Sequence, residues 1–588
     1  MLQGCTDMLD TTPYDKISTG SMWTTEDLAD KGVAGIYDVM YTKTMTTTNP
    51  NISSDPGLNR QGIEVIGFCS TYYLNTDVLV SSAPSAGYSW FSKEWKFGYE
   101  GIHRCNDAIA NLHKANLDEA KYQRLMCECK FLRAFFYCRM NLLFKGVPIY
   151  LEPINSSEAY RGASTVDEVW QVCIDDLTDC INNEYLPNNT LTTNYGRPSK
   201  GAAYALRGIV YLWKEQYDLA IKDFEEVSKC GYGLWDGKYI DFFKYENEKN
   251  KEMIFPLQFD ESTGYCDNFQ LMVGARDHYD CWTEIMPSPD FVNYYRNADG
   301  SEFKWEDYLP GWDGLTESQR EVFFLRDNLK SNASAYKDAT KRVGEAIMNQ
   351  YYLNSGNEAR IKKAYENRDP RLQQTVITPY ATANCYSPYY NSGVQMQNKV
   401  LRWPYLNRGK DGGDMWHDKR GAGYYIYRKY NETEKGRYVD RVHCHCDWPL
   451  LRYTDIWLHY AEALNEVGRL DDAIAAVNVI RQRAGMPLLT KGGTGYNTVT
   501  AKEDMRERIR YERRVELCLE GINYFDEVRW GTYKQMKFQN QETGGVKAFW
   551  GKVTGGKWYY KDYMTTWPVP LTETQKNPNL KQTEGWNY

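Results

Sequence analysis

The sequence predicts a mainly α-helical protein, in which a stack of about four tetratricopeptide-like helical hairpins is covered by a long irregular region with short strands. Three observations support this prediction. Apolar residues recur at helical spacing through much of the first half, a helix–turn–helix pattern occurs twice, and the region between its two copies has few long apolar periods. We expect residues 1–20 to form a tether and residues 21–588 to form one domain.

Helices of the first half are indicated by the spacing of their apolar residues. The segments concerned are residues 22–41, 90–113 and 128–144. Gly146-Val147-Pro148 is expected to end the last of them. Thr165-x-x-Glu168 is a capping box that opens the next helix, and Thr500-x-x-Glu503 is a second capping box near the end of the chain.

The repeated pattern occupies residues 202–232 and 456–485, where small and apolar residues recur at the same offsets. Gly208 and Ala461 hold equivalent positions in the first helix of each copy, and a small residue there allows the second helix to approach closely. Two further helical hairpins are predicted, at residues 128–181 and 503–530. Because such a unit buries its apolar face only by stacking on neighbours, part of the remaining chain must cover the stack.

The region of about residues 233–450 differs in composition and is rich in Gly, Asn, Asp, Tyr and Trp. Glu252–Phe259 reads as a strand, and most of the rest reads as loop. Its many aromatic residues indicate an ordered region, because disordered chains are poor in aromatics. Long ordered loops in a compact protein commonly carry function, so we expect the ligand-binding region here.

Composition excludes several classes of function. Of the 588 residues, 42% are hydrophobic and 25% are charged, as in ordinary folded proteins. The formal net charge of −8 argues against a nucleic-acid partner, which calls for a basic surface. No run of about 20 apolar residues occurs, so no membrane-spanning helix is predicted.

Catalytic signatures are absent from the sequence. It contains no P-loop, no Gly-x-Ser-x-Gly elbow, no His-Glu-x-x-His and no dinucleotide-binding fingerprint. His443–Cys446 is the one metal-like cluster, but in a strand its two His and two Cys would point to opposite faces, so we predict no metal site and no cofactor. A pair of glycosidase carboxylates is defined in space rather than in sequence, so a surface glycoside hydrolase stays an alternative.

Aromatic residues make up 15% of the chain, with 48 Tyr and 18 Trp. A flat ring can stack on the C–H face of a sugar while nearby Asp or Arg side chains bind its hydroxyls, which is the usual chemistry of a mostly apolar site with a few polar groups. Core packing is the alternative for each of these rings. The candidate ligand-binding residues are Asp55, Tyr72, Tyr73, Trp90, Trp282, Tyr294, Trp305, Trp312, Arg368 and Trp416. Trp95, Tyr99, Trp213 and Trp457 lie on helical apolar faces and are assigned to the core.

Cys5 stands apart from the other cysteines, many of which lie inside helical patterns where a thiol packs as a small hydrophobic group. It follows Leu2-Gln3-Gly4, and this tetrapeptide is similar to the end of a bacterial lipobox. The basic and apolar parts of a signal peptide do not precede it. We expect Cys5 to be lipidated and residues 1–20 to be a lipoprotein tether that starts after the signal peptide, with a chance Gly-Cys near a native start as the alternative.

Segments along nearly the whole chain resemble, in order, the signatures of the SusD/RagB family, which are outer-surface lipoproteins of Bacteroidetes. The most specific is Arg510–Gly531, RYERRVELCLEGINYFDEVRWG. Lys145 replaces a usual Gly, and Gly585-Trp586 replaces the usual ending. The other segments are Trp95–Asn106, Cys129–Pro148, Pro287–Gly300, Arg368–Leu372, Leu451–Asn465 and Pro568–Gln582.

The resemblance implies an α-rich domain with tetratricopeptide units on one side and variable loops that form a shallow ligand site on the other. It implies no catalysis and no cofactor. It does not indicate which residues of this chain bind the ligand, because the binding loops vary between family members. The expected function is the capture of oligo- or polysaccharide at the cell surface and its delivery to a SusC-like TonB-dependent transporter, by a protein anchored to the outer membrane through lipid. A member that binds peptide or another nutrient is the alternative.

Overall fold

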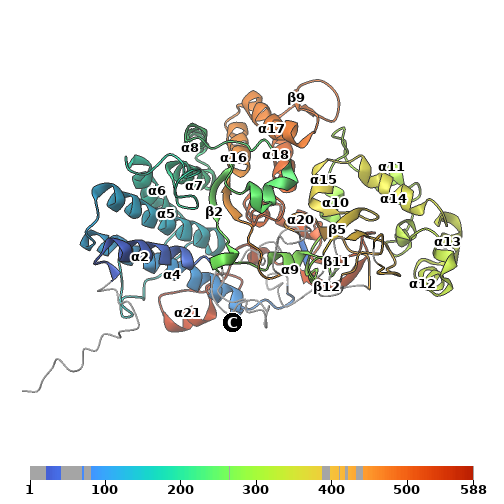
Figure 1. The fold of residues 1–588 in the computed structure, drawn as a ribbon, viewed down its shortest axis with the longest axis horizontal. Helices are drawn as coiled ribbons and strands as arrows, with labels where there is room; N and C mark the ends of the chain where they lie inside the picture. The colour runs from blue at the N-terminus through green and yellow to red at the C-terminus, as the bar shows by residue number, and fades with distance from the viewer. Residues whose placement is uncertain are drawn as a thin grey trace, which may run out of the picture.

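The structure is a computed structural model, and it describes most of the chain. The described residues are 22–41, 69–71, 81–263, 265–386, 397–409, 411–417, 421–431 and 441–586. Helical hairpins occupy one side of the molecule, and short strands with small helices occupy the other (Figure 1). Within the described part, no helix combines the length and the apolar character needed to cross a bilayer.

The first half is helical where its sequence predicts helices. Its helices are α2 (Glu26–Asp38), α4 (Ser89–Asn111), α5 (Glu119–Phe144), α6 (Val166–Asn182), α7 (Lys200–Trp213) and α8 (Tyr217–Lys229). Helix α5 starts earlier than predicted because the Asp118 side chain accepts a hydrogen bond from the Lys121 amide and caps it. It ends as predicted, with Lys145 and Gly146 both at positive φ. The capping box formed by Thr165 and Glu168 is confirmed.

The helices of the second half complete the hairpins. They are α16 (Tyr453–Glu466), α17 (Leu470–Ala484), α18 (Lys502–Glu516), α19 (Asn523–Trp530), α20 (Tyr533–Phe538) and α21 (Leu571–Lys576). The second predicted capping box is wrong, because α18 starts after Ala501 and no side chain caps it. The Thr500 amide instead donates to the Asp504 carboxylate at 3.2 Å, so Thr500 lies one residue outside the cap position.

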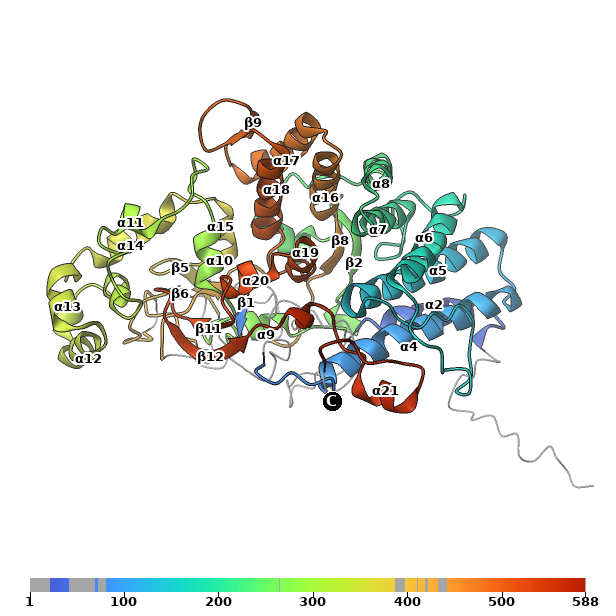
Figure 2. The ribbon, with the colours of Figure 1, turned by 180° about the vertical axis from the view of Figure 1, so that it is seen from behind.

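The helices form one continuous stack in which α4, α5, α6, α7 and α8 follow one another and α16 to α18 continue the series. Seen from behind, α16–α18 lie between the first-half helices and the small helices α10–α15 (Figure 2). The two copies of the repeat meet where α8 packs on α16. There the rings of Phe224 and His459 stack at 6.2 Å, and the Tyr460 hydroxyl donates to Glu225 at 3.0 Å. The predicted fold class is thereby confirmed.

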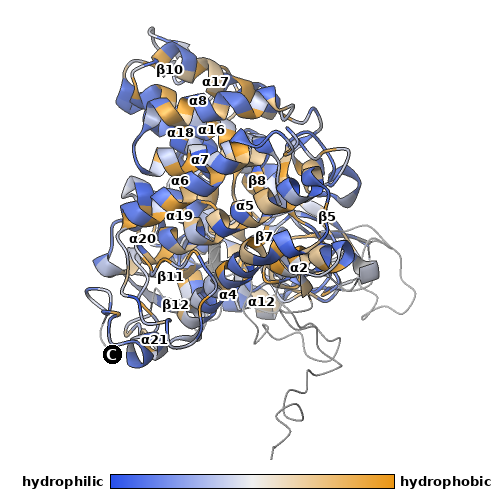
Figure 3. Ribbon diagram, turned by 90° about the vertical axis from the view of Figure 1, so that its left-hand side faces the viewer, coloured by the Kyte–Doolittle hydropathy of each residue, from blue (hydrophilic) through white to orange (hydrophobic). Residues whose placement is uncertain are grey.

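Each helix of the stack carries both hydrophobic and hydrophilic stretches, as amphipathic helices do (Figure 3). In the first repeat the small residue acts as predicted. A Cβ atom placed on Gly208 would lie 2.4 Å from the Phe224 ring, so glycine is what allows α7 and α8 to pack at this separation. In the second repeat Ala461 is fully buried.

The region between the repeats holds short strands in two-stranded sheets, one of which it forms with β1 from nearer the start of the chain. The pairs are β1 (Cys69–Thr71) with β3 (Ile285–Pro287), β2 (Met253–Leu257) with β8 (Trp448–Arg452), β4 (Val376–Ile377) with β7 (Ile426–Tyr427), and β5 (Thr382–Cys385) with β6 (Gln397–Val400). Two more pairs lie beyond it, β9 (Thr490–Lys491) with β10 (Thr498–Val499), and β11 (Thr543–Lys547) with β12 (Val553–Tyr559). Strand β2 confirms the strand predicted at Glu252–Phe259.

Small helices also occur in this region, which is therefore less irregular than its composition suggests. They are α9 (Phe269–Val273), α10 (Pro289–Tyr294), α11 (Trp305–Tyr308), α12 (Ala333–Val343), α13 (Glu345–Tyr351), α14 (Asn357–Glu366) and α15 (Arg371–Thr375). Helix α12 buries only Ala339 and Val343, so it lacks the long apolar period by which a helix is recognised in sequence.

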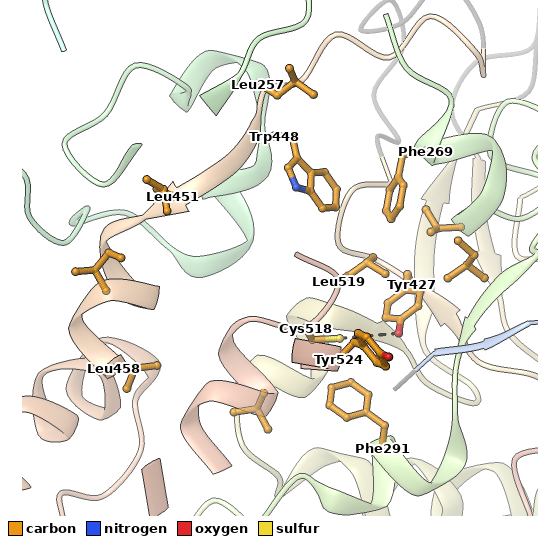
Figure 4. Packing of buried hydrophobic residues seen from close by; sticks show 14 of the residues in the cluster. Leu257, Phe269, Phe291, Tyr427, Trp448, Leu451, Leu458, Cys518, Leu519 and Tyr524 are labelled. Atoms are coloured by element: carbon orange, nitrogen blue, oxygen red, sulfur yellow. Dashed lines mark hydrogen bonds between the residues drawn. The ribbon is translucent and has the colours of Figure 1, made fainter. Parts of the chain in front are cut away.

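One hydrophobic core extends from the helical stack into the loop side (Figure 4). The Trp448 ring on β8 packs edge to face on Phe269 at 5.0 Å. Elsewhere in the same core, the Cys518 thiol lies 3.9 Å from the Tyr427 hydroxyl. The two sides of the molecule are therefore joined by packed side chains.

Candidate functional site

Four of the predicted functional residues, Cys5, Asp55, Tyr72 and Tyr73, lie outside the described residues. The strand that leads to the two tyrosines is described, and its last residue, Thr71, pairs with Ile285.

Trp305 and Trp312 are buried, which corrects the prediction that their rings are exposed platforms. Their side chains are 7% and 5% exposed, and the two indoles stack on each other at 4.8 Å. The Trp305 indole nitrogen donates to Asn293, and Trp312 packs on Phe323 at 5.8 Å. Where helices are short, large rings fill the space between elements, and this need keeps both indoles in the core.

Arg368 is 3% exposed and makes structural contacts, which corrects its assignment to ligand binding, whereas Tyr294 is half-buried and its assignment stays a prediction. The Arg368 guanidinium donates to the carbonyl oxygens of Val292 at 2.9 Å and Tyr295 at 3.1 Å, at the end of α10, and it covers the Phe303 ring at 3.5 Å. Burial lowers the pKa of Arg368 to about 10. The Tyr294 hydroxyl accepts a hydrogen bond from Arg514 at 2.8 Å, which ties α10 to α18.

Trp90 lies in the first turn of α4, within the helix predicted at residues 90–113, and its half-buried ring packs against the core. The structure brings two predicted residues, Trp282 and Trp416, to one polar surface. Both indoles are half-buried. The Arg441 guanidinium lies 5.6 Å from the Trp282 ring centre, and that of Arg408 lies 5.5 Å from the Trp416 ring centre.

Two carboxylates hold these arginines in place. Asp280 pairs with both Arg276, at 2.7 Å, and Arg441, at 2.6 Å. Asp277 pairs with Arg408 at 2.9 Å, and its other oxygen accepts the Trp416 amide at 2.7 Å. We call this set, which comprises Arg276, Asp277, Asp280, Trp282, Arg408, Trp416 and Arg441, the Trp282–Trp416 surface.

The two segments of this surface are tied directly to each other. The Arg276 amide donates to the Trp416 carbonyl oxygen at 2.9 Å. Contacts therefore run without a break from the Trp416 backbone through Arg276, Asp280 and Arg441 to the Trp282 ring. Fixed partners of this kind hold flat rings and guanidinium groups in position before a ligand arrives.

The chain that presents Trp282 has an unusual backbone. Tyr279, Asp280 and Thr283 have φ of 51°, 62° and 53°, in the left-handed region that non-glycine residues rarely adopt and that is especially unfavourable for a β-branched Thr. The Trp282 amide donates to the Leu271 carbonyl oxygen at 2.8 Å, and Thr283 donates twice to Gly274, at 2.9 and 2.8 Å. Strained backbone held by its surroundings is common at ligand sites.

His278 supports this turn from inside. It is fully buried, its Nδ1 accepts the Ala275 amide at 3.1 Å, and its Nε2 lies 3.3 Å from the Cys385 thiol. Burial lowers the pKa of His278 from 6.5 to about 3, so the imidazole is neutral near pH 7 and acts as a support.

Both carboxylates of the surface, those of Asp277 and Asp280, form ion pairs with its arginines. Burial raises the pKa of Asp277, and the Arg408 guanidinium opposes that shift. The side chains of Arg276, Arg408 and Arg441 are about a quarter exposed. Among the described residues, no group of three or more His, Cys, Asp or Glu could hold a metal ion.

Sequence reasoning named the two indoles as candidates but did not name the three arginines. Arg276 and Asp280 stand four residues apart, a spacing that can signal an ion pair, but Arg408 and Arg441 come from other segments and gave no local signal.

Comparison with known proteins identifies the family. A family model described as "SusD family" matches residues 251–586, and another, described as "Starch-binding associating with outer membrane", matches residues 7–212. The chain belongs to the SusD family. The order of the SusD-family signatures read from the sequence agrees with this assignment.

Among related SusD-family proteins, "Starch-binding protein SusD" of Bacteroides thetaiotaomicron is 23% identical over 99% of this chain and 96% of that protein. A SusD-like protein of Bacteroides fragilis has a solved structure with a TM-score of 0.70 at 25% identity, covering 98% of this chain and all of that one. The structure described as "Laminarin binding SusD-like protein" has a TM-score of 0.61 at 19% identity, covering 96% of this chain and 100% of that one.

Proposed function

We propose that this protein captures oligo- or polysaccharide at the surface of the outer membrane and delivers it, without catalysis, to a SusC-like TonB-dependent transporter. The observation that carries the proposal is the Trp282–Trp416 surface, where two half-buried indoles each lie beside an arginine that a carboxylate holds in place. Indole faces stack on sugar rings, and guanidinium N–H groups donate to hydroxyls.

The comparisons support this choice of ligand. One SusD relative is named for starch binding and one structural neighbour for laminarin binding. The family model over residues 7–212 is described by starch binding and outer-membrane association. Lipid attachment at Cys5 is part of the proposal.

Affinity electrophoresis tests the proposal. The full chain is run through gels that contain starch, laminarin or no polysaccharide, beside Trp282→Ala, Trp416→Ala and the control Tyr496→Ala, whose ring is 60% exposed on another loop. We expect retardation by one polysaccharide and a loss of affinity of about tenfold, equal to about 1.4 kcal/mol, for each Trp variant but not for the control.

Three results would contradict the proposal. Tight binding of peptides with no retardation by any glycan would favour the peptide alternative. Release of shorter sugars from an incubated glycan would show a hydrolase. Failure to co-purify with the co-expressed transporter would remove the delivery step.

A further inference from the structure

A cavity that shares no residue with the Trp282–Trp416 surface lies between α4, residues 148–160 and α21 with the residues that follow it. Its volume is about 380 Å³, at the lower end of the roughly 300–1,000 Å³ usual for ligand pockets. Helix α21 and α4 lie on the edge of the molecule opposite α8 and α17 (Figure 1).

The walls of this cavity are fixed by hydrogen bonds between its three segments. From α4, the Tyr99 hydroxyl donates to the Pro148 carbonyl oxygen at 2.7 Å, and the Asn106 amide donates to that of Tyr150 at 2.9 Å. From the C-terminal segment, Asn577 donates to Arg161 at 2.9 Å and Asn579 donates to Tyr160 at 2.6 Å. The cavity is thus formed before a ligand binds.

Aromatic rings line much of the cavity. Trp95 and Tyr99 lie with their ring centres 5.1 Å apart, and Tyr99 meets Tyr150 edge to face at 6.0 Å. Tyr160 stands at the mouth with its side chain 47% exposed. The cavity is therefore lined largely by aromatic rings, of which Tyr160 is the one most exposed to solvent.

The polar groups of the cavity have mixed character. Glu152 and Glu573 supply carboxylate acceptors, and Lys576, which pairs with Glu573 at 3.3 Å, supplies an ammonium donor. A phosphate or nucleotide would need an excess of basic groups. A sugar, whose hydroxyls both donate and accept, matches this combination of acceptors, donor and rings.

We propose that this cavity is a second carbohydrate subsite, which takes a mono- or disaccharide unit of a neutral glycan. The inference rests on the proposed function, since the same glycan that lies across the Trp282–Trp416 surface would supply the unit. Tyr160 stacks on the sugar ring at the mouth, and Glu152 accepts its hydroxyls.

Hydrogen exchange of the full chain tests this subsite, with maltoheptaose and laminarihexaose as probes. Peptides covering 148–161 and 571–580 report on the cavity, and peptides covering 274–283 report on the Trp282–Trp416 surface. We expect the oligosaccharide that binds to protect both. In the double variant Trp282→Ala, Trp416→Ala, protection should remain in the cavity peptides only.

Two more variants change the cavity itself. Tyr160→Ala removes an exposed ring and should lower the affinity of the cavity for the oligosaccharide about tenfold, as measured by the concentration that protects the cavity peptides. Ala159→Trp should fill the cavity and abolish the protection of these peptides. Tyr185→Ala, with a ring 40% exposed elsewhere, is the control and should change nothing.

The outcomes separate this inference from the proposed function. Protection of 274–283 without protection of the cavity peptides overturns the subsite and leaves the function standing. Cavity protection that persists unchanged in Ala159→Trp also overturns it. Tight binding of peptides, with no binding of any glycan, overturns both proposals.

Discussion

Gly208 lies where α7 crosses α8, with the Phe224 ring against its backbone. Its role was visible in the sequence, because a small residue at that place in a repeated helical hairpin has one structural purpose. The indoles of the middle region gave no such signal. Trp282 and Trp305 both stand in loop-like sequence, yet the first lines a polar surface and the second is 7% exposed in the core.

Gly208→Ala should lower the free energy of unfolding by about 1–3 kcal/mol, because the new methyl group would lie 2.4 Å from a buried ring and the helices would have to separate. The matched control is Gly35→Ala in α2, where only an Arg104 nitrogen lies near, at 3.7 Å. That change should stabilise the protein by up to about 1 kcal/mol through helix propensity. Urea unfolding measures both, and equal effects of the two variants would show that the α7–α8 contact is not tight.

At the scale of elements, α18 and α19 are joined to the stack by buried ion pairs. Arg513 pairs with Asp455 on α16 and with Asp526 on α19, both at 2.7 Å. Arg529 on α19 pairs with Glu462 on α16 at 2.6 Å. The Glu and Arg residues that make this segment distinctive in the sequence therefore hold the last hairpin in place and take no part in the candidate site.

Arg513→Leu should destabilise the protein by about 3–5 kcal/mol, because it removes the 2.7 Å partner of two buried carboxylates and leaves them only the longer contacts of Asp526 with Arg529 and of Asp455 with His459. Lys31→Ala, which breaks an exposed pair with Asp27, should cost less than about 1 kcal/mol. Chemical denaturation of both variants checks this. A small loss for Arg513→Leu would mean that water or a neighbouring cation takes over its role.

For the molecule as a whole, Glu516 links the middle region to the stack. Its carboxylate pairs with Arg371 on α15 at 3.2 Å, with Arg452 on β8 at 3.4 Å, and with Arg483 on α17. Burial alone would raise the pKa of Glu516, but the guanidinium groups of Arg483, Arg452 and Arg371 outweigh it and lower the pKa from 4.5 to about 2.

Stability should therefore fall as the pH drops from about 4.5 towards 2. In that window the unfolded chain takes up a proton at Glu516 that the folded protein does not, so protons favour unfolding, and this group alone contributes about 3 kcal/mol. Unfolding free energies measured from pH 7 to pH 2 test the sign. In Glu516→Gln the protein should be less stable at pH 7 and its acid dependence shallower, whereas an unchanged slope would assign the acid loss to other carboxylates.

The sequence by itself determined the helical stack, the position of the repeat, the strand at Glu252–Phe259 and the family, because helical periodicity, capping and family signatures are recorded in neighbouring residues. It also narrowed the candidate site to a set of aromatic residues. Only the tertiary structure decided which of them face a polar surface. Trp305 and Trp312 are covered by each other and by Phe323, whereas Trp282 and Trp416, far apart in sequence, are brought together through Arg276, Asp280 and Arg441. Burial and long-range pairing depend on contacts between distant segments, and no local pattern encodes them.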